Sequence, residues 1–136
     1  MPTPFAAGEN YAIELDGEHV VGRVWRRPDL DSASGARSAD EMAAHLRSLT
    51  TEKRKSLLLD LRDAPAIAGP RTVETLSDLL RGCEKAGVRI AVILSGDAMQ
   101  LLQFRRLVST FAPSAGRAAV TLAEGEQWLS AGIRGK

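Results

Sequence analysis

The chain has 136 residues, 44% of them hydrophobic, which is enough for one domain with its own core. Its 18 basic and 17 acidic residues give a formal net charge of +1, which argues against the broad basic surface that nucleic acid or an anionic membrane requires. A single cysteine, Cys83, excludes an internal disulfide and a cysteine-based metal cluster. Because no apolar stretch approaches membrane-spanning length and the start lacks a secretion signal, we expect a cytoplasmic protein without membrane insertion.

The segment after the first few residues predicts a β-hairpin. Apolar Tyr11, Ile13 and Leu15 alternate with Ala12 and Glu14, as in a strand with one buried face. An Asp-Gly pair follows and supplies the chemistry of a tight turn, and a valine-rich stretch comes next. The residues before this hairpin include two prolines and a glycine, so we expect a loose lead-in there.

The first helix is predicted to begin at Ser38. Residues 26–37 contain a proline, two serines and a glycine, which is typical of a loop. Ser38 and Glu41 then stand three residues apart, which is the spacing of a capping box, and Met42 and Leu46 follow at helical spacing. The change from turn-forming residues to helical periodicity places the helix start at Ser38.

Two continuous apolar runs predict strands in the middle of a sheet. Residues 56–61 (SLLLDL) and 89–94 (RIAVIL) lack the alternation of a half-exposed strand, so we expect both to be buried on two faces. Between them, helical spacing of apolar residues from Val73 to Cys83 predicts a helix. Gly87 is placed to end this helix in a left-handed conformation.

The remainder of the chain predicts a helix, a strand and a last helix. Asp97 is expected to cap a helix that ends before Pro113. Residues 117–122 (RAAVTL) predict a weaker strand. Thr121 and Glu124 have the spacing of a second capping box, which predicts that the last helix begins there.

The predicted order of elements is therefore ββαβαβαβα. Strands separated by single helices need right-handed crossovers, which build a mostly parallel sheet flanked by helices. We expect an α/β fold with a sheet of four or five strands. One domain is predicted to span residues 10–130, with flexible termini at residues 1–9 and 131–136.

This order and three stretches of sequence resemble the STAS domain, the fold of bacterial anti-sigma factor antagonists. The stretches are LLLDLRD (residues 57–63), RIAVILSG (residues 89–96) and EGEQWL (residues 124–129), which are similar to a divergent STAS-like group. The resemblance covers residues 10–130. It implies a STAS-like, non-enzymatic regulatory or adaptor domain that binds another protein, such as a kinase-like or signalling partner.

The resemblance also implies that a switch is missing. In that family, domains that act as phospho-switches carry a serine just before the second helix, within Asp-Ser-x-Gly. Counting from Asp60 places the Asp-Ser pair at Ala68 and Gly69, and neither residue can accept a phosphate. Thr72 is the nearest hydroxyl, and its modification would require a shift of three positions. We therefore expect a divergent member without the serine switch, and phosphorylation of Thr72 is left open.

The junction before the second helix has a physical interpretation of its own. Gly69 is expected to be the N-cap and Pro70 the first helical residue, where a missing N–H leaves no hydrogen bond unmade. The free backbone N–H groups beside Arg71 would attract a phosphate or carboxylate. The simpler alternative is that this Gly-Pro pair only starts a helix. The candidate partner- or anion-binding residues are Asp63, Gly69, Pro70, Arg71, Thr72, Thr75 and Ser95.

Other residues offer little for catalysis. His19 and His45 lie far apart without metal-ligand spacing, and Cys83 shares an apolar helix face, which favours a buried, inert thiol. Asp60 follows a central strand, where α/β sheets collect ligands, but a magnesium site would need further carboxylates. We expect Asp60 to pair with Arg62 instead. The sequence therefore predicts no metal, no cofactor and no enzymatic activity.

Two basic clusters remain. Lys53-Arg54-Lys55 and Arg105-Arg106 are expected to be solvated faces, and contact with an acidic protein partner is the alternative. They are too few for a nucleic-acid-binding surface. Because some STAS-like folds resemble lipid-transfer domains, binding of a small molecule or a lipid is the alternative function. A homodimer is left open.

Overall fold

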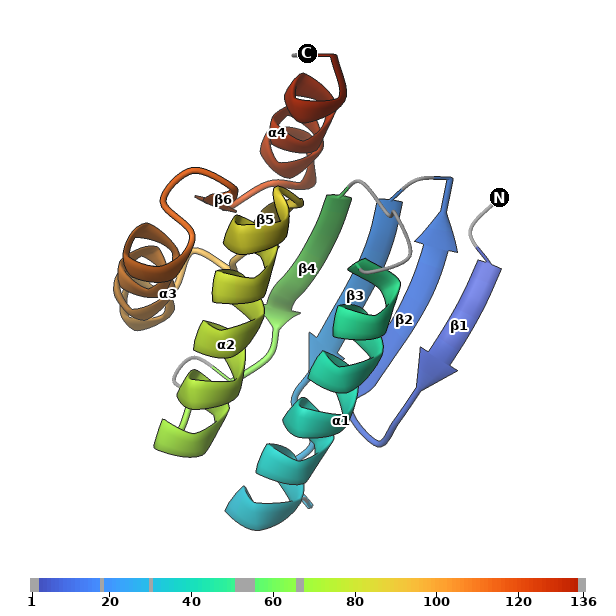
Figure 1. Ribbon diagram of the computed structural model, residues 1–136. Helices are drawn as coiled ribbons and strands as arrows, with labels where there is room; N and C mark the ends of the chain where they lie inside the picture. The colour runs from blue at the N-terminus through green and yellow to red at the C-terminus, as the bar shows by residue number, and fades with distance from the viewer. Residues whose placement is uncertain (1–2, 18, 30, 51–55, 66–67, 135–136) are drawn as a thin grey trace.

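In the part of the chain that the structure describes, the protein forms six strands and four helices (Figure 1). The structure is a computed structural model, and it describes residues 3–17, 19–29, 31–50, 56–65 and 68–134. None of these helices has the length and apolar character needed to cross a membrane. The elements are β1 (Thr3–Ala7), β2 (Tyr11–Asp16), β3 (His19–Trp25), α1 (Ser32–Thr50), β4 (Ser56–Asp63), α2 (Pro70–Ala86), β5 (Arg89–Ile93), α3 (Ala98–Phe111), β6 (Gly116–Ala119) and α4 (Leu122–Arg134).

The strands follow the chain across the sheet in the order β1-β2-β3-β4-β5-β6. β1, β2 and β3 pair antiparallel, because only short connections join them. β3, β4, β5 and β6 pair in parallel, because each connection returns through one helix. The predicted α/β class with a mostly parallel sheet is therefore confirmed.

β1 corrects two expectations. The sheet has six strands, not four or five, and a strand occupies part of residues 1–9, where we expected a loose lead-in. β1 pairs with β2, with Thr3 opposite Leu15 and a bulge between Pro4 and Ala6. Most of its side chains are exposed. Because an edge strand of this kind shows no alternation of buried and exposed residues, its sequence resembles that of a loop.

The first helix begins at Ser32 and not at the predicted Ser38. The Asp31 carboxylate accepts a hydrogen bond from the Ser34 N–H at 2.7 Å, which supports the start of the helix. This bond lowers the pKa of Asp31. Ser38 instead donates its hydroxyl to the Asn10 side chain at the start of β2. The hydroxyl predicted to cap the helix is therefore used in a tertiary contact.

Helices cover both faces of the central strands. α1 and α2 lie side by side on one face, and α3 lies toward the β6 edge (Figure 1). α4 packs against β4, β5 and β6 on the other face. Along β4, Leu57, Leu59 and Leu61 belong to the larger core under α1 and α2, and Leu58 belongs to the smaller core under α4. The predicted burial of both central strands is confirmed.

Local signals placed several helix ends correctly. Gly87 has φ 73° and ends α2 in the left-handed region. The Asp97 carboxylate accepts two backbone N–H groups at the start of α3. The Thr121 hydroxyl accepts a backbone N–H of the first turn of α4 at 3.1 Å. α4 runs to Arg134, so much of the tail that was expected to be flexible is helical.

Gly125 brings α4 into direct contact with β5. An added Cβ at Gly125 would lie 2.4 Å from the Cδ1 atom of Ile93, which is fully buried. We predict that Gly125→Val lowers the free energy of unfolding by about 1–3 kcal/mol through overpacking. Gly82→Ala is the control, because an added Cβ on α2 meets no atom within 4 Å, and we expect it to stabilise the fold by about 0.5–1 kcal/mol. Urea denaturation measures both changes, and a Gly125→Val protein of wild-type stability would contradict the close contact.

Candidate functional site

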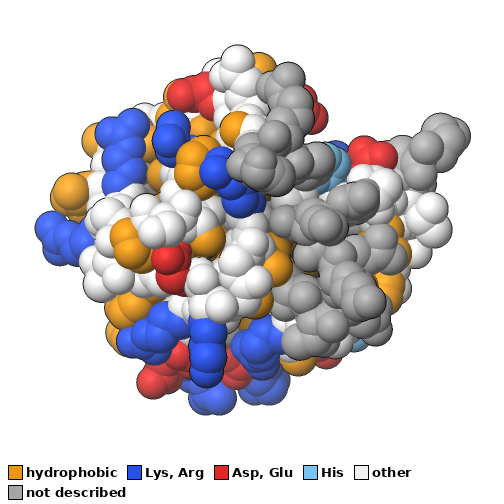
Figure 2. All heavy atoms as spheres, turned by 45° about the horizontal axis from the view of Figure 1, so that its top comes forward, with side chains coloured by type: hydrophobic (Ala, Val, Ile, Leu, Met, Phe, Trp, Pro, Cys, Tyr) orange, Lys and Arg blue, Asp and Glu red, His pale blue; other side chains and the backbone are white. Residues whose placement is uncertain are grey.

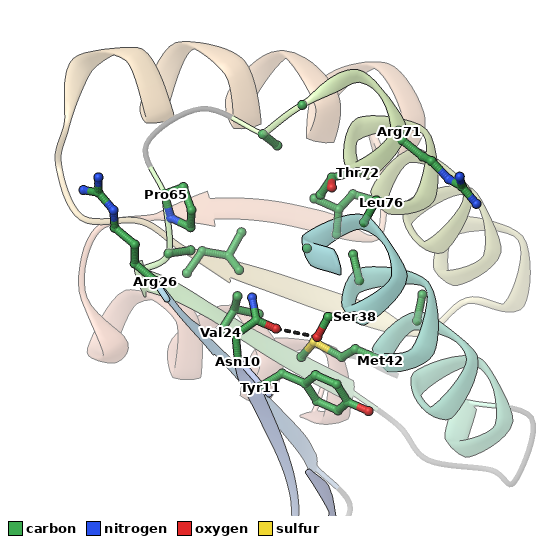
Figure 3. Close-up of a pocket in the computed structure, with 18 of the residues that line it drawn as sticks. Asn10, Tyr11, Val24, Arg26, Ser38, Met42, Pro65, Arg71, Thr72 and Leu76 are labelled. Atoms are coloured by element: carbon green, nitrogen blue, oxygen red, sulfur yellow. Dashed lines mark hydrogen bonds between the residues drawn. The ribbon is translucent and has the colours of Figure 1, made fainter. Parts of the chain in front are cut away.

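A pocket of about 490 Å³ opens between α1 and α2 at the carboxyl ends of β3 and β4 (Figure 3). Open α/β sheets bind ligands at this edge, because loops and helix N-termini meet beyond the ends of the parallel strands. The beginnings of α1 and α2 and the start of β2 border the pocket. Its position and its volume make it a candidate binding site.

The interior of the pocket is largely apolar. Its walls come from β3, β4, α1, α2 and α3, and most of its larger apolar side chains also belong to the larger core. These larger apolar residues are Val24, Met42, Leu46, Leu59, Leu61, Leu76, Leu79 and Phe104. Such an interior favours the hydrocarbon part of a ligand over an ion.

Small residues on α1 leave the space that forms the pocket. Gly35, Ala36, Ala39 and Ala43 line it and recur at the three- and four-residue spacing of one helix face. Because these side chains are small, they leave space between α1 and α2 beside this face. The sequence contains this signal, but the prediction placed Gly35 and Ala36 in a loop and so missed it.

Polar groups surround the mouth of the pocket. The Ser38 hydroxyl donates to the Asn10 side chain, which joins α1 to the start of β2 (Figure 3). Arg26 is exposed and lies on the same side of the pocket as Pro65 (Figure 3). The Arg26 backbone N–H donates to the Asp63 carbonyl at 2.9 Å, which ties the ends of β3 and β4 together. Within the described residues the Arg26 guanidinium forms no ion pair.

The start of α2 forms the opposite rim of the pocket. Gly69 is the N-cap with an extended backbone (φ −71°, ψ 168°), and Pro70 is the first helical residue, as predicted. No side chain caps this end, and no described residue accepts a hydrogen bond from the N–H of Arg71 or of Thr72. Gly69, Pro70 and Arg71 are exposed, and Thr72 is half-buried against the pocket. Four of the seven candidate residues therefore lie together here.

Asp40 of α1 binds two of the candidate side chains. Arg71 Nη2 lies 3.4 Å from an Asp40 oxygen, in an exposed ion pair. The Thr75 hydroxyl donates to the same carboxylate and lies 3.1 Å from the Arg71 carbonyl oxygen. Arg71 accordingly points away from the pocket (Figure 3), and Thr75 is buried between the helices. Thr75 thus holds α1 and α2 together and is not on the surface that a partner would contact, which differs from our expectation.

The two remaining candidates do not line the pocket. Asp63 is exposed at the end of β4 and contributes its carbonyl to the bond from Arg26. Ser95 follows β5, and its N–H and hydroxyl lie 2.8 and 3.0 Å from the side-chain oxygen of the buried Gln100. The Gln100 amide in turn donates to the Leu61 carbonyl at 2.9 Å. Ser95 therefore helps to join the end of β5 to α3 and β4.

Asp60 pairs with Arg62, as predicted, on the face of β4 opposite the pocket. Arg62 Nη2 lies 2.8 Å from one carboxylate oxygen, and the Arg62 backbone N–H donates to the other at 3.1 Å. Burial raises the pKa of Asp60, but the hydrogen bonds and charge of Arg62 lower it by more, so the pKa of Asp60 lies below its usual range. The Asp60 carboxylate is therefore charged and is held by Arg62.

The cysteine and the two histidines lie apart from one another and do not line the pocket. Cys83 is buried, as predicted, and burial raises the pKa of its thiol to about 12, so the reactive thiolate is scarce at neutral pH. His19 pairs through Nδ1 with the Ser56 hydroxyl, and His45 packs edge-on against Phe5 at 5.9 Å between ring centroids. Among the described residues no three histidine, cysteine or acidic side chains gather in a way that could hold a metal ion. The predicted basic cluster at residues 53–55 lies outside the described residues.

No protein-family model and no curated protein sequence matches the chain. Among solved structures, the chain is similar to the one described as "NMR Structure of the protein TM1081", with a TM-score of 0.60 and 12% sequence identity over 93% of each chain. At this level of identity the likeness establishes the fold that the two proteins share. It says nothing about a ligand or a partner.

We predict that Asp60 stabilises the fold more at neutral pH than in acid. Its pKa in the folded protein lies below the unfolded value of about 4, so its contribution is present above that value and is lost as the pH falls through the folded-state pKa. Asp60→Asn should lower the free energy of unfolding by about 1 kcal/mol at neutral pH and by a smaller amount near pH 2. Asp78→Asn, which removes an exposed pair with Arg81, should have little effect at either pH. Denaturant titrations at both pH values test this, and a constant effect of Asp60→Asn would contradict it.

Proposed function

We propose that this protein is a STAS-like, non-enzymatic domain whose pocket binds a small amphipathic molecule. The observation that carries the proposal is the apolar cavity of about 490 Å³ at the carboxyl edge of the parallel strands. A volume of this size falls in the range of ligand sites, roughly 300–1,000 Å³. The resemblance of the sequence to STAS-like domains, some of which resemble lipid-transfer domains, supports the same conclusion.

The chemistry of the lining supports one class of ligand. A hydrocarbon portion would contact Met42, Leu76 and their apolar neighbours inside the cavity. A polar or anionic head would remain at the mouth, near the guanidinium of Arg26 and the N–H groups of Arg71 and Thr72, for which no described residue is an acceptor. A fatty acid or a similar amphiphile has this combination of groups.

The polar side chains of the lining support a binding role over a catalytic one. The Tyr11 hydroxyl donates to Glu41, and burial together with this carboxylate raises the pKa of Tyr11. Asp31 is occupied by the Ser34 N–H, which holds the start of α1. Both side chains thus have partners within the fold, which favours a structural role for each of them.

We predict that Ala39→Phe removes ligand binding, because a benzyl side chain on this face of α1 fills the cavity. Native mass spectrometry of the protein purified from its own host should show a bound small molecule in the wild type. The bound mass should be absent from Ala39→Phe, and decanoate added to the purified proteins should distinguish them in the same way. Occupancy of the variant should fall at least about tenfold, equivalent to about 1.4 kcal/mol of binding free energy.

Ala44→Phe is the matched control for this experiment. Ala44 lies on the same helix but is exposed and does not line the pocket. It should retain the bound mass and the decanoate affinity of the wild type. Equal binding by all three proteins, or no bound mass in repeated preparations together with no decanoate binding, would reject the proposal.

A second candidate function is protein binding at the start of α2, and one observation favours it. Gly69, Pro70 and Arg71 form an exposed helix end at which no described side chain forms a cap. This is the junction at which, by the resemblance, STAS domains with a serine switch are modified. We propose that the junction here serves a regulatory or adaptor role without a phosphate on the chain itself.

We predict that Arg71→Glu abolishes capture of that partner from native lysate, because the reversed charge repels an anionic group at the helix end. Lys85→Glu is the control, since Lys85 is exposed at the far end of the same helix. Both variants should keep the wild-type circular dichroism spectrum. Affinity purification followed by protein identification tests the prediction, and unchanged capture by Arg71→Glu would count against it.

A further inference from the structure

β6 forms an open edge of the sheet. The Ile90 N–H donates to the Ala115 carbonyl at 2.9 Å, and the Leu94 N–H donates to the Ala119 carbonyl at 2.8 Å, so these carbonyls face β5. Because peptide groups alternate in direction along a strand, the N–H and C=O of Ala118 face away from β5. No described strand pairs with this side of β6. The outward N–H groups of Gly116 and Val120 donate to Ala112 and Glu124, so Ala118 is the position at which the edge offers a backbone donor and an acceptor to another chain.

The two edges of the sheet differ in their protection. β1 carries Pro4 and a bulge, two features that discourage further pairing at an edge. β6 contains no proline and pairs with β5 in unbroken register from Gly116 to Ala119. Its length of four residues limits an added strand to a short segment. β6 is thus the more accessible edge for a short peptide.

A groove runs beside this edge, between β6 and α3. It is shallow, with a volume of about 820 Å³. Leu101, Leu102 and Arg105 line it from α3, and Gly116 and Ala118 line it from β6. A strand added to β6 would therefore place alternate side chains against the flank of α3.

Large apolar side chains are exposed at the end of this groove that lies beside the carboxyl end of β6. Met99 and Leu102 of α3 are 54% and 57% exposed. Val120 and Leu122, which follow β6, are 40% and 37% exposed. α3 begins beyond the end of β5, and β6 ends at the same edge of the sheet, so these four residues belong to one end of the molecule. Exposed large apolar side chains beside an open strand are typical of a protein contact.

Basic residues outnumber acidic ones in this region. Residues 98–120 contain three arginines, Arg105, Arg106 and Arg117, and no acidic residue, although the whole chain has a net charge of only +1. The carboxylates that contact these elements, those of Glu84, Asp97 and Glu124, each accept a hydrogen bond from a backbone N–H group. Arg105 and Arg106 are exposed and form no ion pair with any described residue. Arg117 lies over the Trp128 ring at 4.6 Å on the α4 side. Basic and hydrophobic side chains lie together at the left of Figure 2, the side on which Figure 1 places α3 and β6.

We infer that β6 and α3 form a docking site for an extended, acidic peptide segment of another protein. The segment adds to β6 as a strand and pairs with the outward N–H and C=O of Ala118. Its apolar side chains contact Leu101 and Leu102, and its carboxylates face Arg105 and Arg106. Main-chain pairing supplies affinity, and the charge pattern selects the partner.

The same charge pattern disfavours a second copy of this chain at the edge. Pairing of β6 with β6 of another copy would bring two sets of the three arginines together with no acidic residue between them on these elements. Like charges placed together at an interface oppose association. An acidic partner neutralises them instead.

This site is separate from the pocket between α1 and α2, so it goes beyond the proposed function. No residue that borders the groove also lines the pocket. A variant that blocks one site should therefore leave the other unchanged. Decanoate binding by every groove variant serves as an independent check that the pocket is intact.

The test uses a short, capped synthetic peptide of alternating valine and glutamate with the full-length protein. Fluorescence anisotropy should show binding that weakens at high salt, and amide NMR should show the largest shifts at Ala118 and its neighbours on β6. A matched peptide with lysine in place of glutamate should bind at least about tenfold more weakly. Absence of binding by the glutamate peptide, equal binding of the two peptides, or shifts centred away from β6 would overturn the inference.

Two variants and one control make the test specific. Ala118→Pro removes the outward N–H without removing a bond to β5, and Arg105→Glu reverses one charge on an exposed position of α3. Each should lower the affinity for the glutamate peptide at least about fivefold, whereas the Lys85→Glu protein should bind it with wild-type affinity. Arg105→Glu keeps the test decisive if Ala118→Pro unfolds. Wild-type affinity in Arg105→Glu, or self-association that protects the Ala118 amide, would also overturn the inference, and self-association would assign the edge to a second copy.

Discussion

The fold depends on the burial of β4 from both sides. Leu57, Leu59 and Leu61 pack under α1 and α2, while Leu58 packs under α4. β4 also joins the antiparallel and parallel halves, since β3 lies on one side of it and β5 on the other. A strand with two apolar faces has to lie inside a sheet with helices on both sides. The positions of the helices follow from this requirement.

The pocket results from the small side chains on the face of α1 that lies against the sheet and α2. Helices on a sheet normally fill the space between them with large side chains, but the pocket face of α1 presents Gly35, Ala36, Ala39 and Ala43. Asp40, bound to Arg71 and Thr75, holds α1 and α2 together beside the cavity. The atoms that line an empty apolar cavity lack van der Waals partners on one side, so an occupant that fills the cavity gains dispersion energy. A cavity kept open by small residues and closed at its side by polar contacts therefore suits a ligand.

The two proposed sites use different properties of one sheet. The pocket lies where β3 and β4 end, and its chemistry is that of an apolar interior with a polar mouth. The groove lies along β6, and its chemistry is that of arginines beside the outward N–H and C=O of Ala118, which no described strand pairs. β5 lies between β4, which lines the pocket, and β6, which borders the groove, and the two sites share no side chain. A ligand-binding domain that also engages a peptide could in this way connect a small molecule to a partner.

The sequence by itself determined the central strands and the helix ends whose signals are local. Gly69, Pro70, Gly87 and Asp97 act through backbone geometry and adjacent N–H groups, which a short window contains. Tertiary structure decided the rest. β1 is a strand only because β2 lies beside it. Ser38 donates its hydroxyl to Asn10, instead of capping a helix, because the fold brings these two residues together. The burial of Thr75 and the open cavity likewise depend on the distance between α1 and α2, and that distance is set by packing on the sheet and not by the residues adjacent in sequence.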